Sequence, residues 1–233
     1  MPATLTLHLD LTGNPRIYPA RLHGAACALT GHHGTGHHGP PFAVGPLADH
    51  PDGTTTWRLG WLTDDPPPTP PATITFGDTP CSVLHHTTHT RTYAQLATSP
   101  PARHAHLTIT TPLYFSRNGH DHPLPDPALL YRSAATRWNH HAPTPLTIPD
   151  HDLHDLRKHT YITHLDGQTT QAPVSATMNQ TGFIGQLHLA LTRHTTPTTR
   201  TLFATLTHYL TIAGAGAQTT HGFGSLHLDK LTP

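Results

Sequence analysis

The chain has 233 residues, 35% of them hydrophobic, and 13 Lys and Arg balance 13 acidic residues, all of which are aspartate. This length suits one large domain or two small ones. No apolar stretch reaches the roughly 18 residues of a membrane span, and a formal net charge of zero argues against non-specific nucleic-acid binding.

The composition is biased toward histidine and proline, with 25 of each and only two lysines, Lys158 and Lys230. The histidines are spread along the whole chain, which favours compositional drift in a GC-rich genome over a metal-binding tract. The N-terminus lacks the pattern of a signal peptide. Cys27 and Cys81 can pair but need not, so we expect a cytoplasmic protein with reduced thiols.

The first half of the chain reads as a strand, a helix and several further strands. Residues 4–9 alternate polar and apolar side chains, as in a half-buried strand. A helix is predicted from Pro19 to the glycine at position 31. Strands are then expected at 42–47, 54–62, 72–76, 81–89 and 106–111, with a stiff proline-rich connection at 64–71 and a short helix at 93–97. This order is close to a ferredoxin-like βαββαβ unit.

A second, roughly similar α+β half follows a proline-rich segment at 112–127, which predicts a loop and places the boundary near residues 112–125. A helix is expected from Pro127 to about Asn139. After a break at 143–149, strands are predicted at 159–165, 171–178, 183–191 and 225–231, with an apolar-periodic helix at 199–212.

The segment GHHGTGHHG at residues 31–39 carries two histidine pairs and allows three interpretations. The pairs can bind Zn or Ni, although no Cys, Asp or Glu in the loop completes a ligand shell. An imidazole on a loop after a helix can also transfer protons near neutral pH. The third interpretation is a solvated loop of a histidine-biased chain.

Four glycines, Gly214, Gly216, Gly222 and Gly224, fall within the sequence AGAGAQTTHGFG at residues 213–224. Such density indicates positive φ or close approach to another surface, and consecutive backbone N–H groups in such a loop can cradle phosphates. The loop lacks the lysine and the spacing of a P-loop, and it follows a helix, so it is no dinucleotide fingerprint. The alternative is a glycine-rich turn packed against a helix.

Other catalytic patterns find little support. The chain has no glutamate and its aspartates lie mostly in predicted loops, which argues against a two-carboxylate glycosidase or a two-metal nuclease. No serine lies in a nucleophile-elbow pattern. Arg117, Arg132 and Arg137 cluster beside Trp138, where they can contact RNA backbone and bases; the alternative is solvated helix surface beside one core aromatic.

Four stretches, in order along most of the chain, resemble the CRISPR-associated endoribonucleases that process precursor CRISPR RNA, members of the RAMP superfamily. AGAGAQTTHGFG at 213–224 is similar to their C-terminal glycine-rich loop, and TGFIGQLHL at 181–189 to the preceding strand. TPLYFSRNGHDHPLPDPALLYRSAATRWN at 111–139 and HHGPPFAVGPL at 37–47 resemble their central and N-terminal segments.

The resemblance implies an α+β fold of two tandem ferredoxin-like (RRM-like) βαββαβ domains, which we place at residues 1–115 and 116–233. It also implies metal-independent cleavage of CRISPR repeat RNA, without a cofactor, by attack of a ribose 2′-OH that leaves a 2′,3′-cyclic phosphate and a 5′-OH. The RNA-binding residues expected in the glycine-rich loop, together with one arginine of the preceding helix, are Gly214, Gly216, Gln218, Thr219, Thr220, Gly222, Phe223 and Arg137.

By the same resemblance, a histidine after the first helix is the general base or acid. His37, five residues before Phe42, fits this position best, and His38 and His33 remain alternatives because the loop varies in length. The chain departs from the family pattern at a first-helix tyrosine, replaced by Cys27, at a nearby lysine, replaced by a proline, and at the leucine before the histidine, replaced by Gly36.

Two alternatives to a repeat-RNA endoribonuclease stay open. The first is a non-catalytic RAMP subunit that holds guide RNA in an effector complex with other Cas subunits. The second is a histidine-rich metal-binding protein. The expected partner is CRISPR repeat RNA or crRNA, no membrane is expected to be involved, and either a monomer or a homodimer is compatible with the family.

Overall fold

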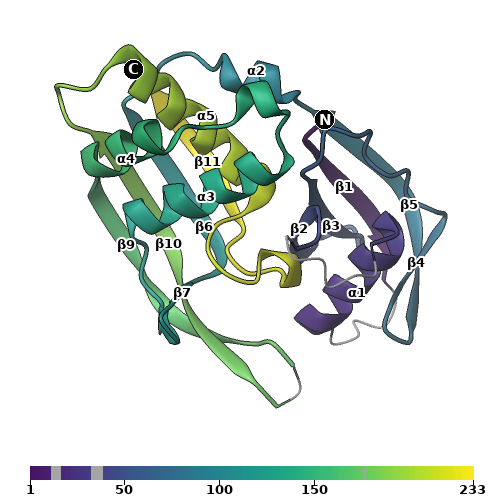
Figure 1. Ribbon diagram of the computed structural model, residues 1–233. Coiled ribbons are helices and arrows are strands. Elements are labelled where there is room, and N and C mark those ends of the chain that lie inside the picture. The colour runs from purple at the N-terminus through teal and green to yellow at the C-terminus, as the bar shows by residue number, and fades with distance from the viewer. Residues whose placement is uncertain (12–16, 33–38, 176) are drawn as a thin grey trace.

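The computed structural model describes residues 1–11, 17–32, 39–175 and 177–233. Two antiparallel sheets lie side by side, one built from the first part of the chain and one from the rest (Figure 1). We call these two parts the first unit and the second unit. None of the described helices is long and apolar enough to cross a membrane.

The first unit orders its strands β2-β3-β1-β5-β4, and all neighbours pair antiparallel. Alternation along β1 directs Ala3, Leu5, Leu7 and Leu9 into a core shared with α1. Its elements are β1 (Ala3–Asp10), α1 (Pro19–Thr30), β2 (Phe42–Asp49), β3 (Thr55–Trp61), β4 (Thr73–Phe76) and β5 (Thr79–Thr90).

The second unit orders its four main strands β11-β6-β10-β9, with α3, α4 and α5 on one side of the sheet (Figure 1). Taken in chain order, this is the 4-1-3-2 arrangement of a ferredoxin-like unit. Its elements are α2 (Tyr93–Ala97), β6 (His104–Leu113), β7 (Phe115–Arg117), β8 (His120–His122), α3 (Pro127–His141), η1 (Thr144–Leu146), α4 (Asp150–His159), β9 (Thr160–Pro173), β10 (Asn179–Leu191), α5 (Pro197–Ala213), η2 (Thr219–His221) and β11 (Leu226–Thr232).

The fold class of two ferredoxin-like units is confirmed, but one strand lies in a different unit from the one expected. β6, predicted to close the first unit, pairs with β10 and β11 of the second sheet. In the first unit β5 takes that edge of β1 instead. A division between residues 115 and 116 falls inside β7, whereas the two main sheets divide between β5 and β6.

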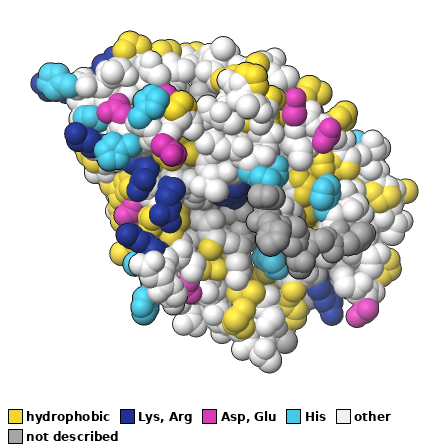
Figure 2. Space-filling model, in the orientation of Figure 1, with side chains coloured by type: hydrophobic (Ala, Val, Ile, Leu, Met, Phe, Trp, Pro, Cys, Tyr) yellow, Lys and Arg dark blue, Asp and Glu magenta, His cyan; other side chains and the backbone are white. Residues whose placement is uncertain are grey.

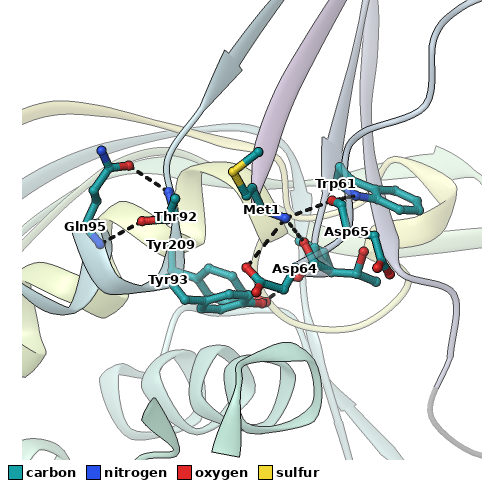
Figure 3. Close-up of polar contacts among 10 residues, drawn as sticks. Met1, Trp61, Asp64, Asp65, Thr92, Tyr93, Gln95 and Tyr209 are labelled. Atoms are coloured by element: carbon teal, nitrogen blue, oxygen red, sulfur yellow. Dashed lines mark hydrogen bonds and ion pairs between the residues drawn. The ribbon is translucent and has the colours of Figure 1, made fainter. Parts of the chain in front are cut away.

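The short predicted helix at 93–97 is confirmed as α2, but it packs on the second unit. Tyr93 lies edge-on to Trp138, with ring centroids 4.7 Å apart, and its hydroxyl donates to the carbonyl of Leu62. Figure 3 shows Tyr93 and Tyr209 near Asp64 at the end of the first unit, and the Trp61 Nε1 that donates to Asp65 O. No helix lies between β3 and β4, where a complete βαββαβ unit has its second one.

Three further features differ from the sequence-based expectation. α4 lies where no element is expected, because DHDLHDLRKH offers only two apolar residues; Leu156 is buried against α3 and α5, while Asp150 and Asp152 in the first turn and a basic last turn suit the helix dipole. Most of the expected strand 159–165 and only the first three residues of the expected strand 171–178 belong to one long strand, β9, which pairs along its length with β10. Part of the expected loop at 112–127 forms the β7–β8 hairpin.

The two units meet where the end of α5 abuts β3. A Cβ atom built on Gly60 of β3 would lie 1.9 Å from the carbonyl oxygen of Ile212, so only glycine fits there. The neighbouring Arg58 donates to the carbonyl of Thr211. This contact places the segment that follows α5, the glycine-rich loop, between the units.

Candidate functional site

The glycine-rich loop at residues 213–224 leaves the end of α5 and runs between the two units (Figure 1). Its short helix η2 packs against α1 and β2 of the first unit. The loop therefore joins two elements of the second unit, α5 and β11, while its helix η2 contacts the first unit.

Close backbone packing explains why the loop needs its glycines. Gly216 and Gly224 have φ of +77° and +62°, and a Cβ atom there would lie 2.2 Å from Tyr114 O and 1.8 Å from Ala215 O. Backbone hydrogen bonds from Ala217 to Tyr114 and from Gly224 to Pro112 hold the loop at the same places. The glycines thus serve the loop's own folding, which the alternative of a packed turn also predicts.

Arg137 of α3 holds the start of the loop. Its guanidinium donates to the carbonyls of Ala213, at 2.6 Å, and Gly214, at 2.8 Å, and to the hydroxyl oxygens of Thr219, at 2.6 Å, and Ser133, at 3.0 Å. A cation suits the C-terminus of α5. Burial lowers the pKa of Arg137 to about 10, so it remains charged at neutral pH. These contacts make Arg137 a residue that positions the loop.

The remaining residues predicted in the loop fall into two groups. Phe223 is buried with Tyr114 and Val174, its ring edge-on to Tyr114, so it anchors the loop. Gln218 has the rare φ of +52° and precedes η2. The backbone N–H groups of Gln218, Thr219 and Thr220 have no acceptor in the described part of the chain.

Two histidines that the sequence analysis did not single out join the loop to α1. The rings of His23 and His221 stack with centroids 4.2 Å apart, and Nδ1 of His23 lies 3.0 Å from the carbonyl oxygen of Thr220. That carbonyl can only accept, so His23 carries its proton on Nδ1. Burial, followed by repulsion from His23, lowers the pKa of His221 to about 4, and it is neutral at pH 7.

A hollow of about 290 Å³ opens beside His221, between the two units. Pro19 and Leu22 of α1 and Leu47 of β2 form one wall, while Gly222 and Phe223 belong to the opposite one. The hollow therefore lies along the seam where η2 meets the first unit.

The three predicted catalytic histidines, His33, His37 and His38, lie outside the described residues. On either side of their segment the chain is described: it leaves α1 through Gly31 and enters β2 after Pro41, whose carbonyl accepts a hydrogen bond from Leu62. The segment thus connects α1 and β2, the two elements on which η2 packs.

The structure also locates Trp138 and the two cysteines, other residues considered from the sequence. Trp138 is a core aromatic, and both cysteines are free, with Cys81 buried. Among the described residues, no group of three or more His, Cys or Asp is arranged to hold a metal ion. His23 and His221 lie 198 positions apart, and nothing in the spacing of histidines along the chain predicts that they meet.

The comparisons with known proteins agree with this architecture. The Cas6 (TTHA0078) product complex has a TM-score of 0.81 at 22% identity, over 98% of this chain and 99% of that chain. The Cas6 (TTHB231) product complex gives 0.80 at 23% identity, over 98% and 100%, and Thermus thermophilus Cas6 (TTHB231) gives 0.73 at 21%, over 98% of both chains. At these identities the likeness concerns the fold. No curated protein matches the sequence.

The family evidence comes from the sequence itself. The sequence model described as CRISPR-associated endoribonuclease Cas6 matches residues 107–226, which is more than half of the chain and includes most of β6, all of α3 and the whole glycine-rich loop. With two ferredoxin-like units and this loop between them, the chain belongs to the Cas6 family of CRISPR-associated endoribonucleases.

Proposed function

We propose that this protein is a metal-independent endoribonuclease that cleaves CRISPR repeat RNA to mature crRNA. A ribose 2′-OH attacks the adjacent phosphate, which yields a 2′,3′-cyclic phosphate and a 5′-OH. The observation that carries the proposal is the packing of η2 against α1 and β2, because the histidine-rich segment connects those two elements. Two structurally similar proteins, solved as a Cas6 product complex and a Cas6 substrate mimic complex, support it.

The chemistry asks for one proton acceptor and one donor near neutral pH, which imidazoles provide. We assign one role to His37, with His38 and His33 as the alternatives. The nucleophile belongs to the substrate, so the reaction needs no metal to generate hydroxide. Acid–base catalysis of this kind contributes on the order of 10²–10⁴-fold, and in-line positioning of the scissile phosphate supplies much of the rest.

The glycine-rich loop supplies positioning in this proposal. The backbone N–H groups of Gln218, Thr219 and Thr220 are consecutive and without an acceptor in the described chain, which suits them to phosphate oxygens. Gly214, Gly216 and Gly222 support this role indirectly, because a Cβ atom at each would meet protein atoms of the loop or of its neighbours, so glycine maintains the loop conformation. RNA of the repeat type is read by hairpin shape and by splayed bases.

The test is cleavage of end-labelled repeat RNA, in EDTA, by the wild-type protein and by His33→Ala, His37→Ala and His38→Ala. We expect wild-type cleavage that ends in a cyclic phosphate, and a loss of roughly 10²–10⁴-fold in rate for one variant. His194→Ala, at an exposed site after β10, is the matched control and should cleave normally.

One further substrate completes the design. An RNA with a 2′-deoxyribose at the cut site should bind and remain intact. Cleavage of that RNA, or a requirement for added metal, would overturn the mechanism. Tight binding without cleavage by any form would instead identify a subunit that holds guide RNA.

A further inference from the structure

A second hollow borders the glycine-rich loop on its α3 side. It has a volume of about 340 Å³ and is formed by α3, by Phe115 and Ser116 of β7 and by loop residues 216–219. This volume is typical of ligand sites, which begin at roughly 300 Å³. All of its lining residues belong to the second unit, so it is separate from the seam beside His221.

Ser133 presents an unused proton to this hollow. Its hydroxyl oxygen accepts hydrogen bonds from Arg137 Nη2, at 3.0 Å, and from the backbone N–H of Gly216, at 3.2 Å. A hydroxyl has two lone pairs and one proton, so both acceptor positions are occupied and only donation remains. No acceptor for that proton exists among the described residues.

Two more lining groups can donate hydrogen bonds. Thr219 accepts from Arg137 at 2.6 Å and keeps its own hydroxyl proton. Arg132 is exposed, and in the described chain its guanidinium has neither a hydrogen bond nor an ion pair. No carboxylate or side-chain amide lines the hollow to balance these donors. Such a site is complementary to a ligand that carries negative charge and accepts hydrogen bonds.

The apolar part of the wall argues against a stacked base. Phe115 and Leu129 are only 5% and 8% exposed, so neither offers a face on which a base could stack. Arginine is well matched to phosphate oxygens because its planar fork can donate two parallel hydrogen bonds. Figure 2 shows Lys and Arg side chains over the region of α3 and α4, with Asp and His side chains among them, so this face carries mixed charge; the exposed cation that lines the hollow is Arg132.

We infer that this hollow binds a non-scissile phosphodiester of the repeat RNA, with Arg132 as its principal cation and Ser133 and Thr219 as hydroxyl donors. The inference rests on the proposed function for the identity of the RNA. Gly216 and Thr219 line this hollow, and His221, two residues further along the loop, lines the hollow between the units. A bound strand would therefore follow the loop from the α3 side toward the seam where η2 meets α1 and β2.

The experiment measures binding of a repeat RNA with a 2′-deoxyribose at the cut site, as a function of salt, to wild type, Arg132→Gln, Arg132→Lys and Arg193→Gln. For Arg132→Gln we expect about tenfold weaker binding at low salt and a log–log salt slope shallower by about 0.7–0.9. Arg132→Lys should restore most of the slope. Arg193 is exposed on the turn after β10, so Arg193→Gln removes the same charge away from the hollow and should bind as wild type does.

A series of RNAs, each with one neutral methylphosphonate linkage, then locates the contact. One position should weaken binding to wild type and have no effect on Arg132→Gln. Equal losses for Arg132→Gln and Arg193→Gln, or no position that couples to Arg132, would overturn the inference. Competition by inorganic phosphate at millimolar concentration, without any coupled position, would mean a site for free phosphate and would overturn it as well.

The proposed function is judged by a different readout, cleavage of unmodified repeat RNA by wild type. Cleavage with no change in binding on Arg132→Gln would refute only the hollow. Binding that depends on Arg132 without cleavage would refute only the nuclease.

Discussion

The two units share one strand order but differ in how they are completed. The second unit has helices α3 and α5 on its sheet, with α4 beside them, and an aromatic cluster in which Tyr93, Trp138 and Tyr209 pack with centroids 4.7 to 6.0 Å apart. Among its described residues, the first unit has a single helix, α1. Ile74 and Phe76 of β4 fill part of its core, with Phe76 edge-on to Trp57.

This difference between the units matches a difference in role: the second unit holds the glycine-rich loop, and the first unit carries the histidine-rich segment. The complete unit holds the glycine-rich loop through Arg137, Ser133 and the backbone of residues 112–114. The incomplete unit carries the histidine-rich segment and reaches the loop through η2 and through β3 against α5. In the proposed function, the histidines can act on a phosphate held by the loop only while the two units stay docked.

The largest effect is expected where the units touch. In Gly60→Ala the new methyl group would overlap the carbonyl of Ile212, which forces β3 away from α5. We expect a loss of about 3 kcal/mol in the free energy of unfolding and loss of RNA cleavage, measured by chemical denaturation and by the cleavage assay.

Gly24→Ala in α1 is the matched control, because a Cβ atom there meets nothing within 4 Å. It should be neutral or stabilise the protein by up to about 1 kcal/mol. If Gly60→Ala is as stable and as active as Gly24→Ala, the docking of the units does not depend on this contact.

A smaller loss of stability is expected where Arg137 binds the glycine-rich loop. Arg137→Ala leaves the carbonyls of Ala213 and Gly214 without their donor and should cost about 2 kcal/mol of stability. Arg137→Lys keeps the charge but lacks the planar fork and should recover only part. Arg132→Gln, on the exposed side of the same helix, should stay within about 0.5 kcal/mol of wild type; a similar loss there would argue against a specific role for Arg137.

The smallest expected loss of stability depends on pH and comes from His221, at the seam between the units. The pKa of His221 is about 4 in the folded protein and near 6.5 when unfolded. Between these values the unfolded state binds the extra proton, so the stability from neutral His221 is complete above pH 6.5 and declines as the pH falls toward 4.

Because His221 is only partly buried, the loss between pH 7 and pH 5 should be on the order of 1 kcal/mol. His221→Gln should flatten the curve of unfolding free energy against pH by that amount. His194→Gln removes an exposed histidine and should leave the curve as in wild type. Parallel curves for wild type and His221→Gln would show that this stacked pair does not tie the units together.

Local patterns predicted most of the elements correctly. Period-two alternation predicted β1, proline and glycine bounded α1, and helical spacing predicted α5. The failures share a cause, since α4 is too polar to show a stripe and the unit to which β6 belongs depends on pairing with strands far along the chain. The histidine-rich segment lies outside the described residues, so its role stays a prediction.

Local spacing and composition were enough to predict most of the elements, the family and the presence of a glycine-rich loop. They could not predict that Gly216 and Gly224 are required by backbone packing, that Arg137 holds the loop or that His23 meets His221. Such contacts join residues distant in the chain. Their energy comes from close approach and burial, which no local pattern of residues records.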